Sequence, residues 1–306
     1  MKSTILEILK TSPDIISGEE LSKRLEVSRV SIWKHIKALQ ELGYDIVSSS
    51  KGYSYASEND LLYPWEFGRR ESLIHHYQTL PSTMDMARDL ARKGAPDGSV
   101  VIAEVQKKGR GRMQRHWLSQ RGGIYMTLIL RPRIPAVSGF LLNFMTGTSL
   151  VETIREFTGI DARVKWPNDL LVGRKKLSGM IAEMETAADM ITFVNIGIGI
   201  NVNNNPSTEE KSATSIAQLL GYKIRRKELL YMFFDNLAAR MEQMNLDTAV
   251  QDWKQYTMTI GREVEVVTLT DTTRGKAVDV DDSGALHVKL PDNTIKKVVY
   301  GDCFHR

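Results

Sequence analysis

The sequence predicts an α+β protein in three domains, at residues 1–63, 64–256 and 257–306. Its 306 residues allow two or three domains at roughly 100 to 200 residues each. The first sixty residues space their apolar side chains as helices do, the middle mixes helical and β-rich runs, and the last fifty alternate as short strands. With 42% hydrophobic residues, each part can bury a core.

The composition predicts a soluble, cytoplasmic protein. No apolar run approaches the ~18 residues that a membrane-spanning helix needs, and residues 1–10 lack the features of a secretory signal. Cys303 is the one cysteine, which excludes an internal disulfide and suits a reducing compartment. The excess of positive charge lies in residues 64–256, with 26 basic and 20 acidic side chains. Nucleic acid and a compact polyphosphate ligand explain that excess equally well.

Residues 1–63 predict a winged helix-turn-helix. Apolar positions between residues 5 and 9 indicate a first helix, the capping box Ser17-Gly-Glu-Glu20 opens a second, and Ser28 caps a third. A hairpin with Gly52 at its turn follows these helices. The expected apolar side of the third helix consists of Val30, Trp33, Ile36, Leu39 and Leu42.

The third helix is placed to enter a DNA major groove. Five cations face a single acid, Glu26, over residues 23–37, and local charge of this kind meets phosphates. The domain as a whole carries one more acid than base, and similar helical trios dock proteins. DNA binding is therefore the favoured interpretation, and protein docking is the alternative. The expected DNA contacts are Arg29, Ser31, Lys34, His35 and Lys37.

The middle of the chain predicts one mixed domain that is large enough for a pocket. Tyr63-Pro-Trp65 is expected to be the linker that precedes this domain. The expected helices are residues 83–93, 149–157 and 227–244, and the expected strands are residues 99–105, 124–130, 177–184 and 191–200.

The tail predicts a small SH3-like β-barrel. Its short apolar runs are separated by Asp, Ser, Gly and Asn turns, as in compact all-β units. The expected strands are residues 264–269, 276–280, 286–290 and 295–299.

The most informative stretch is Gln106-Lys-Lys-Gly-Arg-Gly-Arg-Met-Gln-Arg-His-Trp117. It follows a predicted strand and places five cations within nine residues, without an acid. Gly109 and Gly111 let the backbone approach a ligand, while the arginines supply planar donors for carboxylate and phosphate. An anion-binding loop and a solvated basic turn are both consistent with this pattern. A Walker loop is not, because the Gly-Lys-Ser/Thr ending is absent.

Two further stretches carry polar or glycine-rich patterns. Val164-Lys-Trp-Pro-Asn-Asp169 leads to Gly173-Arg-Lys-Lys-Leu-Ser-Gly179, so Asn168 and Asp169 lie between lysines and could bind a polar ligand or a metal ion. Val194-Asn-Ile-Gly-Ile-Gly-Ile-Asn-Val202 alternates glycine with isoleucine, which leaves room for a flat group on one face of a strand. Taken alone, the first stretch is an ordinary turn, and the favoured interpretation of the second is a bulged core strand.

Together with Leu80-Pro-Ser-Thr-Met-Asp85, these stretches resemble the biotin protein ligases. The family's markers occur here in the family's order, and the flanking domains extend the resemblance over nearly the whole chain. A winged helix before the ligase domain is similar to the bifunctional members that also repress biotin genes. Met84 departs from the pattern, since many members have a polar residue there. The matching segments are Ser82-Thr83 and residues 109–115, 165–169, 176–179 and 197–202.

The resemblance implies a biotin/lipoate ligase-like central domain and a two-step reaction with ATP and Mg²⁺. Biotin is activated as biotinyl-5′-AMP and then passed to a lysine of a biotin carboxyl carrier protein. Such chemistry needs positioning and charge neutralisation more than a protein nucleophile. The implied second function is repression at operator DNA by a homodimer that responds to biotinyl-AMP, with residues 123–130 near the dimer edge. The alternatives are a lipoate-protein ligase and a ligand-sensing transcription factor without catalysis.

The resemblance also implies roles for individual residues. Residues 203–214 correspond to a loop that orders over the adenylate, and Asp169 is the expected metal ligand. Expected catalytic residues are Lys176, Arg112 and Lys165. Expected biotin contacts are Ser82, Thr83, Met84, Gln106, Gly109, Arg110, Gly111, Arg112, Lys176 and Gly179. Expected ATP contacts are Arg112, Arg115, Trp117, Asn168, Asp169 and Asn201.

Overall fold

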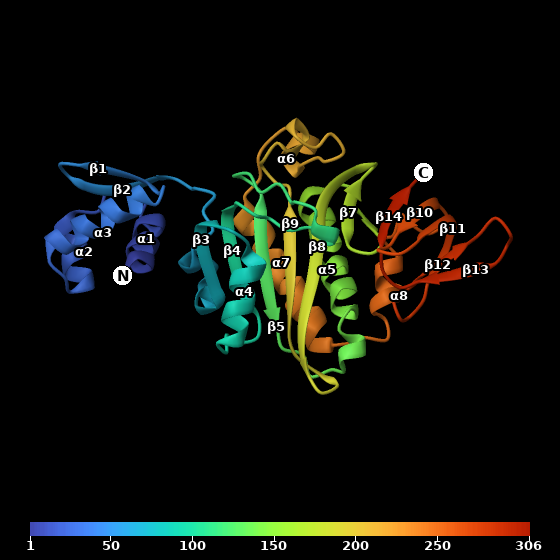
Figure 1. Cartoon of the computed structure of the whole chain (residues 1–306). Coiled ribbons are helices and arrows are strands. Elements are labelled where there is room, and N and C mark those ends of the chain that lie inside the picture. Colours follow the sequence, from blue (N-terminus) through green and yellow to red (C-terminus); the bar gives the residue numbers. More distant parts are fainter. The chain divides into compact units, whose positions relative to one another are not determined.

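The computed structural model describes residues 1–306, except for the side chain of Gln114. The chain forms two compact units, Met1–Glu71 and Ser72–Arg306. The first unit contains α1 (Lys2–Thr11), α2 (Gly18–Leu25), α3 (Arg29–Glu41) and the hairpin of β1 (Asp45–Ser49) and β2 (Gly52–Ser57) (Figure 1). This order confirms the predicted winged helix-turn-helix.

Local capping explains where the second and third helices begin. The Ser17 side chain accepts a hydrogen bond from the Glu20 amide at 3.0 Å, and Ser28 accepts one from the Ser31 amide at 3.1 Å. Each serine thereby satisfies an amide that the first helical turn leaves without a partner.

The apolar side predicted for α3 is partly wrong. Val30 and Trp33 are 62% and 50% exposed, whereas Ile32, Ile36 and Leu39 are fully buried. The cause is the helical period, because positions four and then three residues apart form one stripe and Val30 and Trp33 lie on the adjoining face. Two large apolar side chains therefore lie on the solvent side of α3.

The segment expected to be a linker packs against the first unit. Tyr63 is buried, and its ring stacks on that of Trp65 with centroids 5.0 Å apart. The Trp65 indole donates to the Tyr44 hydroxyl at 2.7 Å, and Tyr44 donates to Glu66 at 2.8 Å. These contacts fix the start of η1 (Pro64–Leu73) on the winged helix.

The second unit is built on a seven-stranded sheet of order β3-β4-β5-β9-β8-β7-β6. β3 runs parallel to β4, and every other pair in this sheet is antiparallel. The strands are β3 (Ile74–Leu80), β4 (Ser99–Gln106), β5 (Ile124–Leu130), β6 (Arg163–Lys165), β7 (Asp169–Val172), β8 (Lys175–Ala187) and β9 (Met190–Ile200).

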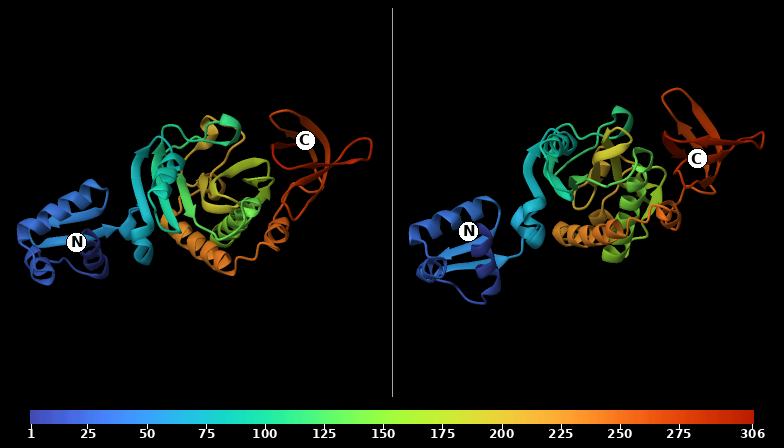
Figure 2. Two further views of the ribbon diagram at one scale, coloured as in Figure 1. Left: turned by 60° about the horizontal axis from the view of Figure 1, so that its bottom comes forward. Right: turned by 90° about the horizontal axis from the view of Figure 1, so that it is seen from below.

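Helices cover both faces of this sheet. α4 (Thr83–Arg92) packs on β4, β5 and β9, while α5 (Leu141–Thr158) and α7 (Arg226–Gln243) lie side by side on the opposite face (Figures 1 and 2). α5 begins eight residues before the predicted helix at 149–157. Thr146 and Thr148 weaken the helical pattern in the sequence, but their hydroxyls donate to carbonyls one turn earlier and remain buried.

Residues 123–130, which were expected near a dimer edge, do not form an edge of the sheet. β5 pairs with β4 on one side and β9 on the other, and all seven of its residues are buried. Both rows of its backbone hydrogen-bonding groups are therefore used inside the sheet. The two edge strands are β3 and β6.

The tail forms the predicted small all-β domain. Its five antiparallel strands have the order β13-β12-β11-β10-β14. The buried Trp166 holds it to the central sheet, because its indole donates to the Gly284 carbonyl at 2.9 Å and its amide donates to Thr259 at 3.0 Å. The strands are β10 (Glu263–Val267), β11 (Thr272–Val280), β12 (Leu286–Lys289), β13 (Ile295–Val298) and β14 (Asp302–His305). Two short helices, α6 (Ile216–Leu220) and α8 (Ala249–Lys254), precede them in the chain. Among the described helices, none has the length and apolar character to span a bilayer.

The buried stripe of α3 generates a stability prediction. Ile36→Ala should lower the free energy of unfolding of the first unit by about 2 to 5 kcal/mol, because it leaves a cavity under the helix. Val30→Ala on the exposed face should change it by less than about 0.5 kcal/mol. Hydrogen exchange of α3 amides in the full chain measures both values, and equal effects would contradict the assigned faces.

Candidate active site

The three sequence motifs meet in one pocket at an end of the seven-stranded sheet. The pocket lies where β4 and β9 end and where β7 and β8 begin. The predicted residues that line it are Ser82, Thr83, Met84, Gln106, Arg110, Gly111, Arg112, Arg115, Trp117, Asn168, Asp169, Lys176, Gly179 and Asn201. Tertiary structure thus brings together segments that are more than a hundred residues apart.

The glycines of β9 form the floor of this pocket. A Cβ atom on Gly199 would lie 2.4 Å from the Trp117 ring, and one on Gly197 would lie 2.6 Å from the Met84 sulfur. Any larger residue at either position would push these side chains away from the strand. The Trp117 ring therefore occupies part of the space that these glycines were predicted to leave for a flat group.

One half of the pocket is apolar with a few buried polar groups. Gln106 Oε1 accepts hydrogen bonds from the Thr83 amide at 2.8 Å and the Thr83 hydroxyl at 3.0 Å. Gln106 Nε2 donates to Ser119 at 3.0 Å, which fixes the orientation of the amide. Among the described residues, the buried Ser82 hydroxyl has no hydrogen-bond partner and is free for a ligand. The apolar wall consists of Met84, Met126, Ile181 and Ile198.

The other half of the pocket carries cationic side chains with acidic partners beside them. Lys176 Nζ lies 2.7 Å from Asp169 Oδ1 and 5.4 Å from the centroid of the Trp117 ring. Arg112 Nη1 donates to Asn168 Oδ1 at 3.3 Å. Burial lowers the pKa of the Arg112 guanidinium, while the nearby Asp169 acts in the opposite direction. Because guanidinium stays charged in proteins, this buried cation favours an anionic ligand.

Two predicted residues do not line the pocket. Gly109 is part of the basic loop at residues 106–117. A Cβ atom on Gly109 would lie 2.4 Å from the Trp117 carbonyl oxygen, and the Gly109 carbonyl accepts a hydrogen bond from the Trp117 amide at 2.9 Å. Lys165 lies behind Asp169, with Nζ 5.8 Å from the Phe304 ring. Burial lowers the pKa of Lys165, and Asp169 opposes that effect. These positions suit support of the loop and of Asp169.

Asp302, which no sequence motif indicated, lines the pocket from β14 of the C-terminal domain. Asp302 forms an ion pair with Arg115, 187 residues away in the sequence. No pattern in the sequence connects these two side chains, because only the packing of the tail domain places them together. The C-terminal domain therefore contributes a charge to the site.

The loop at residues 203–214 lines the pocket with Pro206 and with residues near its C-terminal end. The Lys176 amide donates to the Ser212 carbonyl at 2.8 Å, and the Thr214 amide donates to the Lys176 carbonyl at 3.0 Å. Near its middle, Glu209 accepts from Gln120 at 2.6 Å. The loop is thus attached to the strand that carries Lys176, with Glu210 and Ser212 in the pocket wall.

Metal-binding capacity at the site is limited. Within the described residues, no group of three or more His, Cys, Asp or Glu side chains is arranged to hold a metal ion. Asp169 is one of three carboxylates that line the pocket, with Glu210 and Asp302, and it lies next to the amide of Asn168. It suits an ion that brings most of its own ligands with a substrate.

The predicted DNA contacts all lie on α3 of the first unit. Arg29, Lys34 and Lys37 are exposed, whereas Ser31 and His35 are half-buried. The exposed cations are spaced along the helix, so their charges can meet a polyanion.

Family models match three segments of the chain. The Biotin/lipoate A/B protein ligase family model matches residues 76–203, an HTH domain model matches residues 2–54, and the Biotin protein ligase C terminal domain model matches residues 259–306. The order of the three matches is that of the three folded parts.

Full-length relatives and a solved structure share this arrangement. The Bifunctional ligase/repressor BirA of Bacillus subtilis is 35% identical, covering 99% of this chain and 98% of that protein. The Bifunctional ligase/repressor BirA of Escherichia coli is 28% identical over 94% of this chain and 91% of that protein. The structure of a biotin protein ligase from Aquifex aeolicus in complex with biotin and ATP is similar with a TM-score of 0.65 at 27% identity, covering 76% of this chain and 98% of that chain.

The packing of β14 against the site generates a prediction for Cys303. Burial raises the pKa of the Cys303 thiol to about 12, so almost none of it is thiolate near neutral pH. At pH 8, iodoacetamide should alkylate the native protein at least ~100-fold more slowly than the denatured protein. Because Cys303 is the one cysteine in the sequence, intact mass reports the rate directly. Rapid alkylation of the native protein would show that β14 does not stay packed at the pocket.

Proposed function

The chain belongs to the family of bifunctional biotin ligases and repressors, and from this premise we propose how its pocket performs the ligase reaction. In the first step, a biotin carboxylate oxygen attacks the α-phosphorus of ATP, and pyrophosphate leaves as biotinyl-5′-AMP forms. In the second step, a lysine of a biotin carboxyl carrier protein attacks the acyl carbon, and AMP leaves. We propose a cytoplasmic location, where ATP and these macromolecular partners are present.

The observation that carries this proposal is the division of one pocket into a neutral half and a cationic half. The neutral half suits the fused rings of biotin, whose ureido group can bond with Ser82, Thr83 and Gln106. The cationic half suits the biotin carboxylate and the phosphates. Trp117 lies at the junction of the two halves, and the reacting atoms would meet beside it. Met84, Arg110, Gly111 and Gly179 complete the proposed biotin contacts.

Lys176 is the residue that we assign to the reacting centre. Its ammonium group lies against Trp117 and is held by Asp169 at 2.7 Å, so it is oriented before substrates bind. A fixed cation at this point stabilises the charge that develops on the α-phosphate and its oxygens. Arg112 would bind the acyl phosphate, and Lys165 would support Asp169 from behind. Both steps then proceed without a protein nucleophile.

The remaining ATP contacts follow from the same arrangement. Arg115 would exchange its bond to Asp302 for the phosphates, and Trp117 with Asn201 would lie beside the nucleotide. A Mg²⁺ ion would neutralise phosphate charge, and Asp169 with Asn168 would be its protein ligands, since Mg²⁺ commonly binds one carboxylate together with substrate phosphates.

The alternatives fit the pocket less well. The dithiolane ring of lipoate has no N–H or C=O groups, so it would leave the buried Thr83, Gln106 and Ser82 groups without ligand partners. A sensor without catalysis would not need the oriented Lys176 and Arg112. Biotin is therefore the proposed substrate, and the proposed domain division assigns catalysis to residues 64–256.

Pyrophosphate exchange tests the ligase proposal. The purified protein should exchange pyrophosphate into ATP with biotin and not with lipoate. Lys176→Ala should lower the exchange rate by at least ~100-fold with little change in ATP affinity, because the lost interaction forms chiefly in the transition state. Initial rates across ATP concentrations separate the two effects. Exchange supported by lipoate would favour the rival enzyme, and a rise in the Michaelis constant alone would remove Lys176 from the reacting centre.

The repressor half of the proposal depends on α3 and on two copies of the chain. A single first unit neutralises few phosphates, so a monomer should bind DNA weakly, and a dimer gains from effective concentration. In the second unit Val137, Met184 and Met190 are 80%, 42% and 45% exposed, and we propose that they form an apolar patch for self-association. Pro135 bridges Met190, which joins the segments that carry these side chains. We therefore assign the homodimer contact to this patch instead of β5.

Fluorescence anisotropy on a palindromic site upstream of a biotin synthesis or uptake gene tests the proposed repressor function. Biotinyl-AMP should tighten binding by ~5 to 150-fold, and the complex should weaken with salt. Deletion of residues 1–63 should abolish DNA binding. Val137→Glu should remove the effect of the ligand, whereas Val299→Glu, on an exposed valine of the tail, should not. If no salt-sensitive complex forms at micromolar protein, the repressor proposal fails while the ligase proposal stands.

A further inference from the structure

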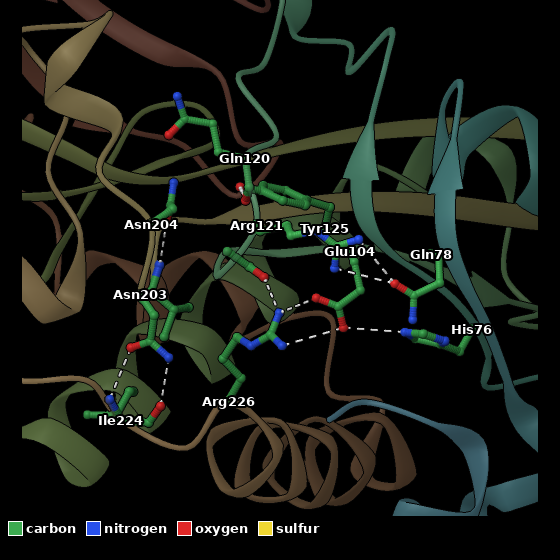
Figure 3. Close-up of polar contacts among 12 residues, drawn as sticks. His76, Gln78, Glu104, Gln120, Arg121, Tyr125, Asn203, Asn204, Ile224 and Arg226 are labelled. Atoms are coloured by element: carbon green, nitrogen blue, oxygen red, sulfur yellow. Dashed lines mark hydrogen bonds and ion pairs between the residues drawn. The ribbon is translucent and has the colours of Figure 1, made fainter. Parts of the chain in front are cut away.

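A buried ion pair outside the pocket joins β4 to the first turn of α7. Arg226 Nη1 lies 2.8 Å from Glu104 Oε2, and the two side chains are 5% and 7% exposed (Figure 3). The buried His76 ring lies 3.3 Å from Glu104 Oε1. Burial raises the pKa of Glu104, but His76 and Arg226 outweigh that effect and bring it down to about 2. The carboxylate is therefore charged and matches the buried guanidinium.

Arg226 also holds a turn that follows the basic loop. Its Nη1 donates to the Gly123 carbonyl at 2.9 Å. Beside it, the buried Tyr125 hydroxyl donates to the Gln120 carbonyl at 2.7 Å. Two carbonyls of the turn at residues 120–123 are thus fixed, one by a side chain of α7 and the other by a side chain of β5 (Figure 3).

This turn is connected to the pocket through two asparagines. The Asn203 amide donates to the Gly122 carbonyl at 2.8 Å. The Asn203 side chain forms two hydrogen bonds with the backbone of Ile224, two residues before Arg226. Asn204 then donates to Asn201 Oδ1 at 2.9 Å, and Asn201 lines the pocket. The ion pair therefore fixes the point at which the loop at residues 203–214 begins.

The hydrogen bonds that begin at Arg226 lead to one half of the pocket. Asn201 and the loop at residues 203–214 lie on the side assigned to the nucleotide. The neutral half is fixed by the hydrogen bonds between Thr83 and Gln106 and by that between Thr127 and Thr83.

We propose that Glu104 and Arg226 are positioning residues for the nucleotide half of the pocket. They act through Gly123 and Asn203, and they hold Asn201 and the start of the covering loop where ATP and the adenylate bind. This inference rests on the proposed ligase function. A purely structural ion pair would stabilise the fold without affecting one substrate more than the other.

Arg226→Met tests the role with a control on the same helix. It should raise the Michaelis constant for ATP in pyrophosphate exchange by at least ~10-fold and speed release of biotinyl-AMP, since small misplacements cost this much or more. The dissociation constant for biotin alone, measured by calorimetry, should change less than ~2-fold. Arg240→Met breaks two ion pairs of equal length but greater exposure, with Glu152 and Asp252 at 2.8 Å each, at the other end of α7. It should lower the melting temperature and leave both substrate constants unchanged.

Two further variants keep the test decisive if Arg226→Met does not fold. Asn203→Ala cuts the connection without leaving a buried charge, and it should reproduce the ATP-selective defect. Arg226→Lys keeps the charge but not the fork that reaches both Glu104 and Gly123, so it should restore stability more than ATP affinity. Equal loss for biotin and ATP, or an ATP defect in Arg240→Met, would overturn the proposal. Absence of exchange in the wild-type protein would instead contradict the ligase function itself.

Discussion

The site depends on the close approach that the glycines of β9 permit. β9 lies between β5 and β8 near the middle of the sheet, so its position is set by hydrogen bonds on both sides. Gly197 and Gly199 leave the space that Met84 and Trp117 occupy. Because Trp117 ends the basic loop, the loop lies close enough to β8 for its arginines to share a pocket with Lys176. A side chain on this face of β9 would separate the two cationic segments.

Charge in the pocket is arranged before a ligand binds. Lys176 is paired with Asp169, Arg112 with Asn168, and Arg115 with Asp302. These partners orient the cations before substrates bind, and the acidic ones also neutralise part of the positive charge. Anionic substrates then displace these partners or bind beside them. The C-terminal domain takes part directly, since Asp302 comes from β14. The C-terminal domain therefore contributes a side chain to the active site.

The same sequence carries a second function on a separate unit. In the first unit, the helical period buries Ile32, Ile36 and Leu39 and leaves the cations of α3 in solvent. The aromatic residues after the wing complete its core, with Tyr63 and Trp65 stacked against each other. This unit resembles the HTH domains in its fold, while the chemistry of the second unit depends on another set of residues. The two functions are joined by the chain and, in our proposal, by the dimer.

The sequence by itself determined the three-part architecture, the helix caps and most of the pocket. Periodicity, capping and glycine spacing act over a few residues, and those signals are present in the sequence. It did not determine which side of α3 faces the core, that β5 is an inner strand, or that Tyr63 and Trp65 pack instead of linking. Only the tertiary structure brought Asp302 to Arg115 and Glu104 to Arg226, which are 187 and 122 residues apart. Such pairs form because strands and helices from distant segments pack together, and no local pattern records that packing.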